Sequence, residues 1–70
     1  MKFNFTSHAQ MRLQERGIWP DDIKIIIKNP TSKIIDADLV IVSGLVKGCN
    51  LCVIYRYEKS NYKIITAYYN

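Results

Sequence analysis

The stretch KIIDADLVIVSGLVKGCNLCVIYRYEKSNYKIITAYY (residues 33–69) decides the fold of this 70-residue chain. It consists of apolar, mostly β-branched and aromatic runs separated by short polar or glycine-containing segments. Such runs are typical of β-strands. We therefore predict strands at KIIDA (33–37), LVIVSGLV (39–46), LCVIYRY (51–57) and YKIITAYY (62–69).

The links between these runs are short, at Ala37–Asp38, Lys47–Asn50 and Glu58–Asn61. Links of this length form hairpins rather than crossovers, so an antiparallel meander is expected. Strict alternation gives the faces of the last two strands. Along 51–57 it separates Leu51, Val53, Tyr55 and Tyr57 from Cys52, Ile54 and Arg56; along 62–69 it separates Tyr62, Ile64, Thr66 and Tyr68 from Lys63, Ile65, Ala67 and Tyr69.

The N-terminal part predicts a short strand and a helix. KFNF (2–5) alternates, which indicates a short first strand or an extended lead-in. Thr6 or Ser7 can cap a helix over about 7–16, and with Ser7 as the cap Gln10 completes a capping box. Gly17 supplies the left-handed residue that ends this helix.

The segment WPDDIKIIIKNP (19–30) predicts a second helix, because Pro20 suits its first turn and Asn29–Pro30 ends it. Isoleucines at 23, 26 and 27 share one face. Ile25 points away from that face, so it is either exposed or in contact with another chain. Two helices packed on one face of a four-stranded antiparallel sheet define an α+β fold, and the whole chain, residues 1–70, is expected to form a single domain.

Length and composition limit the class of protein. A chain of 70 residues buries only about 60% of the surface that its unfolded form exposes, so modest stability is expected. Its apolar content of 49% favours a folded core over disorder. No apolar run approaches the roughly 20 residues that span a bilayer, and MKFNFTSHAQ (1–10) lacks the apolar region of a signal peptide. We expect a cytoplasmic protein with no membrane partner.

Charge and cysteine spacing indicate partners. The formal net charge of +4 favours anionic partners, nucleic acid above all. Cys49 and Cys52 form a C-x-x-C pair with one distant histidine, which is too few ligands for a structural zinc site within one chain. We interpret them as strand thiols that pack as small hydrophobic residues, with an intersubunit metal site as the alternative. No cofactor is expected.

The first predicted helix, SHAQMRLQER (7–16), has an unusual distribution of charge. At about 100° per residue, one continuous arc holds Met11, Glu15, His8, Arg12, Arg16, Ala9 and Leu13. Gln10 and Gln14 occupy the opposite side. We expect the amides to face water and the charged arc to face the sheet. Its charges then either pair with strand residues in a structural network or face a bound phosphate.

FTSHAQMRLQERGIWPDDIKIIIKNP (5–30) resembles a small bacterial family of domains of unknown function with an HAxxRxxERGI signature. The resemblance runs over nearly the whole chain to the closing IITAYYN (64–70). That family in turn resembles the ribonuclease superfamily that includes barnase, EndoU and RelE-type toxins. One departure is Trp19–Pro20, which stands where the family usually has a Ser or Thr cap followed by an ordinary residue.

The resemblance implies a RelE/barnase-like fold and metal-independent cleavage of RNA. The positions that match are His8, Arg12 and Arg16 on the helix, with Arg56, Thr66 and Tyr68 on the strands. A histidine can act as general base or acid, and arginines suit the phosphorane because their planar fork binds two oxygens at once. Tyrosine can stack on a base or donate a proton. Each strand residue also has an ordinary interpretation, as an edge charge or as a packing residue.

Three classes of function remain open. The first is a toxin-like endoribonuclease that acts on RNA and has a cognate antitoxin or another protein partner. The second is a non-catalytic module of the same fold that binds nucleic acid or protein. The third is a partner-dependent structural protein, in which Ile25 and a strand edge support a homodimer. Convergence of His8, Arg12 and a strand arginine or tyrosine on a concave, positive surface, within about 3–5 Å of a shared phosphate position, favours catalysis. A buried His8 bonded to backbone favours the other two classes.

Overall fold

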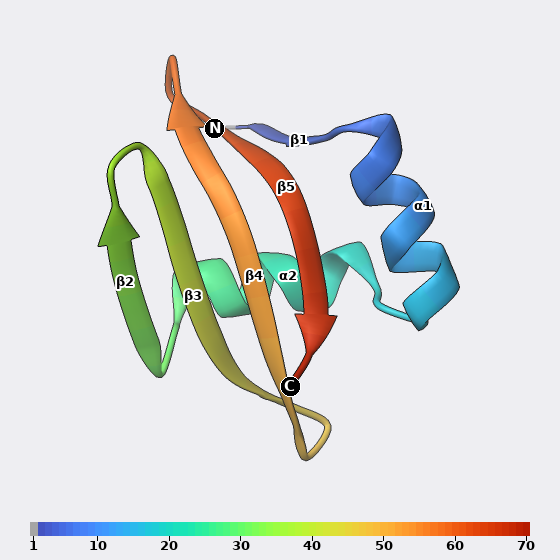
Figure 1. Cartoon of the computed structure of the whole chain (residues 1–70). Helices are drawn as coiled ribbons and strands as arrows, with labels where there is room; N and C mark the ends of the chain where they lie inside the picture. Colours follow the sequence, from blue (N-terminus) through green and yellow to red (C-terminus); the bar gives the residue numbers. More distant parts are fainter. Residues whose placement is uncertain (1) are drawn as a thin grey trace.

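The computed structural model describes residues 2–70 and has the predicted α+β fold (Figure 1). The sheet is five-stranded, with the strand order β1-β5-β4-β3-β2. The elements in chain order are β1 (Lys2–Phe5), α1 (Ser7–Arg16), α2 (Pro20–Lys28), β2 (Ser32–Asp36), β3 (Leu39–Val46), β4 (Cys49–Glu58) and β5 (Asn61–Tyr69).

The first strand joins the sheet in parallel. Strands β2 to β5 form the predicted antiparallel meander, and KFNF forms the strand β1, which pairs with β5. Phe3 lies opposite Tyr62, and their rings stack with centroids 5.0 Å apart. Both helices and strands β2 to β4 lie between β1 and β5 in the chain, and a long connection of this kind permits parallel pairing. The sheet is therefore mixed, with one more strand than the four of the predicted meander.

Both helices begin and end close to the residues predicted from the sequence. Thr6, one of the two candidate caps, is the N-cap of α1, and its hydroxyl accepts a hydrogen bond from Ala9 N at 3.0 Å. The capping box that requires Ser7 as the cap therefore does not form. Gly17, in the left-handed conformation, ends α1. Helix α2 begins at Pro20 without a side-chain cap at Trp19.

A β-bulge in β5 changes which side chains share a face. Ile54 lies opposite Thr66, but Tyr55 lies opposite Ile64, so Ile65 is an extra residue in the ladder. Strict alternation along 62–69 was therefore wrong beyond Ile64. The bulge turns Thr66 and Tyr68 away from the side of Ile64.

Helix α2 runs behind the sheet in Figure 1, and α1 packs against β5, beside it in that view. Ile23 and Ile26 of α2 are fully buried in the core. Helix α2 approaches β3 so closely at Gly44 that a Cβ added there would lie 2.9 Å from Ile26 Cδ1. Ile25, in contrast, is exposed, which was one of its two expected positions.

We call the other face of the sheet, which faces the viewer in Figure 1, the open face. The strand registers place apolar, hydroxyl, basic and acidic side chains on it. Its members include Ile34, Ile41, Ser43, Leu45, Cys52, Ile54, Arg56, Lys63, Thr66 and Tyr68, with the carboxylates of Asp36 and Glu58 at the strand ends. Half of the predicted site residues, those on the strands, therefore lie on this face.

Candidate functional site

Helix α1 packs against the sheet through its small apolar residues rather than through its charges. Ala9 and Leu13 are buried, whereas His8 is exposed and Met11 is 59% exposed. The prediction that the whole charged arc faces the sheet was therefore wrong. Ala9 and Leu13 lie at one end of that arc, and burial of apolar surface sets the rotation of the helix.

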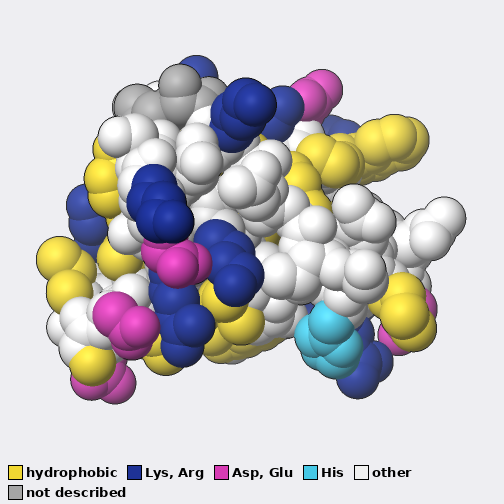
Figure 2. All heavy atoms as spheres, turned by 90° about the horizontal axis from the view of Figure 1, so that it is seen from above, with side chains coloured by type: hydrophobic (Ala, Val, Ile, Leu, Met, Phe, Trp, Pro, Cys, Tyr) yellow, Lys and Arg dark blue, Asp and Glu magenta, His cyan; other side chains and the backbone are white. Residues whose placement is uncertain are grey.

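The exposed flank of α1 carries a contact between His8 and Arg12. Arg12 Nε donates a hydrogen bond to His8 Nε2 at 3.5 Å, and Arg12 Nη1 forms an ion pair with Glu15 Oε2 at 3.3 Å. Arg12 therefore places a cation beside the Nε2 atom of His8. Figure 2 shows the histidine on the surface next to a basic side chain.

Arg16 connects α1 to β5. Its Nη1 donates to Ala67 O at 2.8 Å and lies 3.5 Å from Thr66 Oγ1. Strand β1 pairs with β5 only as far as Ile64, so the outer edge of β5 beyond this point has no partner strand. An unpaired edge carbonyl requires another donor. Arg16 supplies one, which gives it a structural role in addition to its charge.

Arg56 and Lys63 form the basic part of the open face. They lie opposite each other on β4 and β5. Arg56 Nε lies 3.3 Å from Asp38 Oδ2 but is buried without a well-oriented hydrogen bond, and Lys63 Nζ lies 3.9 Å from Glu58 Oε1. Each cation therefore has a carboxylate close by, and the Arg56 Nε donor lacks a good acceptor.

Tyr68 and Cys52 form a polar pair on the same face. They lie opposite each other, and a hydrogen bond between the two side chains raises the pKa of the Tyr68 hydroxyl. Cys52 is buried, whereas Cys49, at the start of β4, is exposed. Within residues 2–70, no group of three or more His, Cys, Asp or Glu side chains could hold a metal ion.

The predicted site residues thus form two groups with one connection. His8 and Arg12 contact each other on α1, whereas Arg56, Thr66 and Tyr68 share the open face. Arg16 contacts Thr66 and joins the two. Across the described part of the chain, no hydrogen bond or ion pair links the His8–Arg12 pair directly to Arg56.

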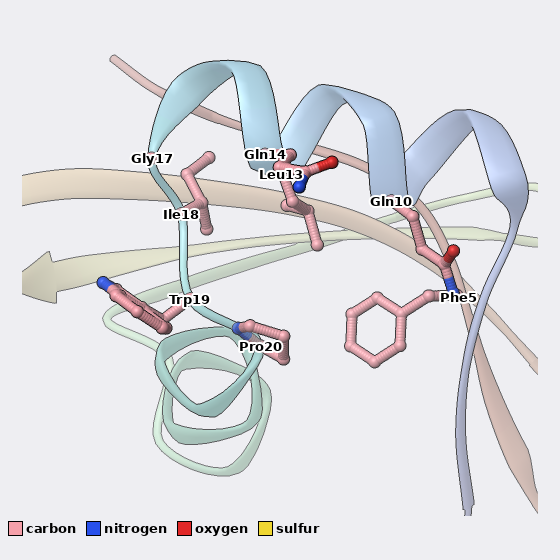
Figure 3. A pocket seen from close by; sticks show the side chains of 8 residues that line it. All are labelled: Phe5, Gln10, Leu13, Gln14, Gly17, Ile18, Trp19 and Pro20. Carbon is pink, nitrogen blue, oxygen red and sulfur yellow. The ribbon is translucent and has the colours of Figure 1, made fainter.

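A groove on the other side of α1 was not predicted. It has a volume of about 550 Å³ and lies between α1 and the start of α2 (Figure 3). Its lining residues are Phe5, Gln10, Leu13, Gln14, Gly17, Ile18, Trp19 and Pro20. The sequence signal was Trp19, a large aromatic residue at a helix junction, which is 65% exposed. None of the predicted site residues lines this groove.

Fold and surface together define a small basic α+β domain with one uncovered sheet face. Residues 5–69 match the family described as Domain of unknown function (DUF4258), and the chain belongs to this family. No curated protein matches the chain, and no solved structure matches it either. Neither described helix is long and apolar enough to cross a membrane.

Proposed function

We propose that this domain is a metal-independent endoribonuclease, with RNA bound across the open face and along the exposed flank of α1. The observation that carries the proposal is the β5 bulge, which turns Thr66 and Tyr68 onto the face that holds Arg56. The bond from Arg16 to Thr66 then connects that face to the helix of His8 and Arg12. The residues chosen are those that the sequence resemblance of this family to the barnase and RelE-type superfamily implies.

Each of these side chains has a separate part in the proposed reaction. Once Arg12 Nε turns from His8 Nε2 to the phosphate, Nε2 takes the proton of the ribose 2′-hydroxyl. The 2′-oxygen then bonds to the adjacent phosphorus as the bond from phosphorus to the 5′-oxygen breaks, and the released 5′-oxygen takes up a proton from water. Arg12, beside that nitrogen, stabilises the charge that develops on the phosphoryl oxygens. Tyr68, whose pKa is raised, stays protonated and can donate a hydrogen bond to the phosphate or to the leaving 5′-oxygen.

A specific observation favours a second candidate, a non-catalytic RNA-binding or protein-binding module. Two of the arginines already have partners within the chain, since Arg16 bonds to Ala67 O and Arg56 lies against Asp38. Residues with such contacts can form a basic surface without assembling a reaction centre. Under the first candidate the expected protein partner is an antitoxin that covers the same face.

Cleavage of RNA in the presence of EDTA tests the proposal. The wild-type chain should produce fragments that end in 2′,3′-cyclic phosphate, because the 2′-oxygen is the nucleophile. His8→Ala should lose at least a hundredfold in rate, in keeping with removal of a general base, and should still bind RNA. Gln10→Ala, on the opposite side of the same helix, is the matched control and should cleave as the wild type does.

The outcomes separate the candidates. Binding of RNA by wild type without cleavage would establish the non-catalytic module. Cleavage that His8→Ala leaves intact would exclude His8 as the base. If the wild-type chain neither binds nor cleaves RNA, both candidates that involve RNA are wrong.

A further inference from the structure

The two edge strands of the sheet are β1 and β2. Beyond the end of β1, Arg16 covers the carbonyl of Ala67 in β5. At the other edge, all five residues of β2 (Ser32–Asp36) are exposed. This strand contains no proline, and its register with β3 runs without a shift. An unbroken, unblocked edge of this kind is a template for another strand.

The backbone N–H and C=O groups of β2 that point away from β3 belong to alternate residues. A two-residue turn joins β2 to β3, and Asp36 lies opposite Leu39 at its base. In a hairpin of this length the closing pair exchanges both hydrogen bonds, so every second residue back along the strand also bonds inward. Lys33 and Ile35 therefore turn their N–H and C=O groups away from β3.

We propose that β2 pairs antiparallel with β2 of a second copy of this chain, so that the two sheets become continuous across a twofold axis. This inference does not depend on the proposed function. In the register that uses all the outward groups, Lys33 of each copy lies opposite Ile35 of the other. The two residues exchange both backbone hydrogen bonds, and the Ile34 side chains meet at the axis on the open face.

The side chains of β2 suit this self-pairing. Ile34 is 56% exposed and Ile35 is 68% exposed in the single chain, one on each face of the strand. In the dimer Ile34 packs on its own symmetry mate, and Ile35 packs on the methylene stem of Lys33. Ser32 lies opposite Asp36, so a hydroxyl meets a carboxylate. No like charges lie directly opposite each other, which favours a second copy over an unrelated strand.

The size of the interface predicts a weak dimer. One pair of five-residue strands buries less surface than stable interfaces, which cover about 1,200–2,000 Å² in total. Dissociation constants of about 10 µM to 1 mM are therefore expected. Because the twofold axis is perpendicular to the sheet, the two open faces lie on the same side of the dimer.

Analytical ultracentrifugation of the full chain tests this inference across about 10 µM to 1 mM protein. The wild type should shift from monomer to dimer with concentration. Ile35→Pro removes an outward N–H that β3 does not use and should stay monomeric. Ile34→Lys places two like charges at the axis and should also stay monomeric. The matched control is Ile25→Lys, an equally apolar exposed position on α2, which should dimerise as wild type does.

Far-ultraviolet circular dichroism shows whether each variant is folded. If Ile35→Pro unfolds, Ile34→Lys decides, because its side chain is exposed in the monomer. A wild type that stays monomeric at the highest concentration overturns the inference, as does an Ile34→Lys variant that dimerises as strongly as wild type. Loss of the dimer in Ile25→Lys would show that the interface lies on α2 and would also overturn the inference. Absence of RNA cleavage would leave all of these outcomes unchanged.

Discussion

Arg16 donates a hydrogen bond to an edge carbonyl of β5 that a longer β1 would otherwise pair. Its guanidinium bonds the carbonyl of Ala67, where β5 has passed the end of β1. Arg16→Gln should lower the free energy of unfolding by about 1–2 kcal/mol, because the carbonyl loses a charged donor. Arg12→Gln is the matched control, and its exposed pair with Glu15 should be worth at most about 0.5 kcal/mol. Urea denaturation measures both, and equal effects would contradict the role assigned to Arg16.

Tyr68 provides a titration that reports on the open face. Its hydrogen bond with Cys52 raises the pKa of the hydroxyl above the usual 10.0. The contribution of this pair to stability is therefore complete below pH 10 and is lost as the pH rises through the value in the folded state. Cys52→Ala should move the Tyr68 titration down towards 10.0. Absorbance at alkaline pH follows the ionisation, and subtraction of a Tyr68→Phe titration assigns it; an unmoved curve would show that Cys52 is not the cause.

At the scale of elements, the two turns at the ends of β4 differ at their second residue, which is Gly48 in one turn and Ser60 in the other. Lys47–Gly48 and Lys59–Ser60 both have two successive residues at positive φ, the mirror-image turn of tight hairpins. Only the first turn has a glycine, and each link is shorter than the four residues predicted. Because side chains strain this conformation, Ser60→Gly should stabilise the chain by about 0.5–1 kcal/mol.

Gly48→Ala is the reciprocal change. Nothing lies within 4 Å of the added Cβ, so only the backbone conformation at φ +80° resists it. The variant should lose about 1 kcal/mol. Thermal denaturation of both variants gives the comparison. Changes of the same sign in the two turns would contradict this account of them.

Most of the elements could be predicted because their signals are local. Pro20, Gly17 and the alternation of residues 51–57 determine boundaries and faces within a few residues of themselves. The bulge at Ile65 could not be predicted, since it depends on the register against β4. The rotation of α1 was also missed, because Ala9 and Leu13 contribute more to packing than the number of charges beside them suggests.

For the whole molecule, the candidate site depends on contacts between distant parts of the chain. The sequence identified His8 and Arg12 through their helical spacing, and their contact is present. The Arg16–Thr66 contact spans 50 residues, and no local pattern indicates it. Thr66 was named by resemblance alone, and alternation put it on the wrong face. The bulge therefore converts a mistaken face into the one on which the proposed function depends.

The net charge of +4 gives the two proposals opposite responses to salt. Binding of single-stranded RNA releases counterions, so its affinity should fall with a log–log slope of about −0.7 for each phosphate contacted. Two copies of a cationic chain repel each other, so screening should strengthen the dimer. Lys63→Gln should make the RNA slope shallower by about 0.7 and leave the dimer intact, because Lys63 lies on β5, three strands away from β2. Titrations of RNA binding and sedimentation from about 50 to 200 mM salt measure the two trends. A dimer that weakens with salt would mean that ion pairs, rather than strand pairing, hold the copies together. An RNA affinity that does not change with salt would exclude contacts between the open face and phosphates.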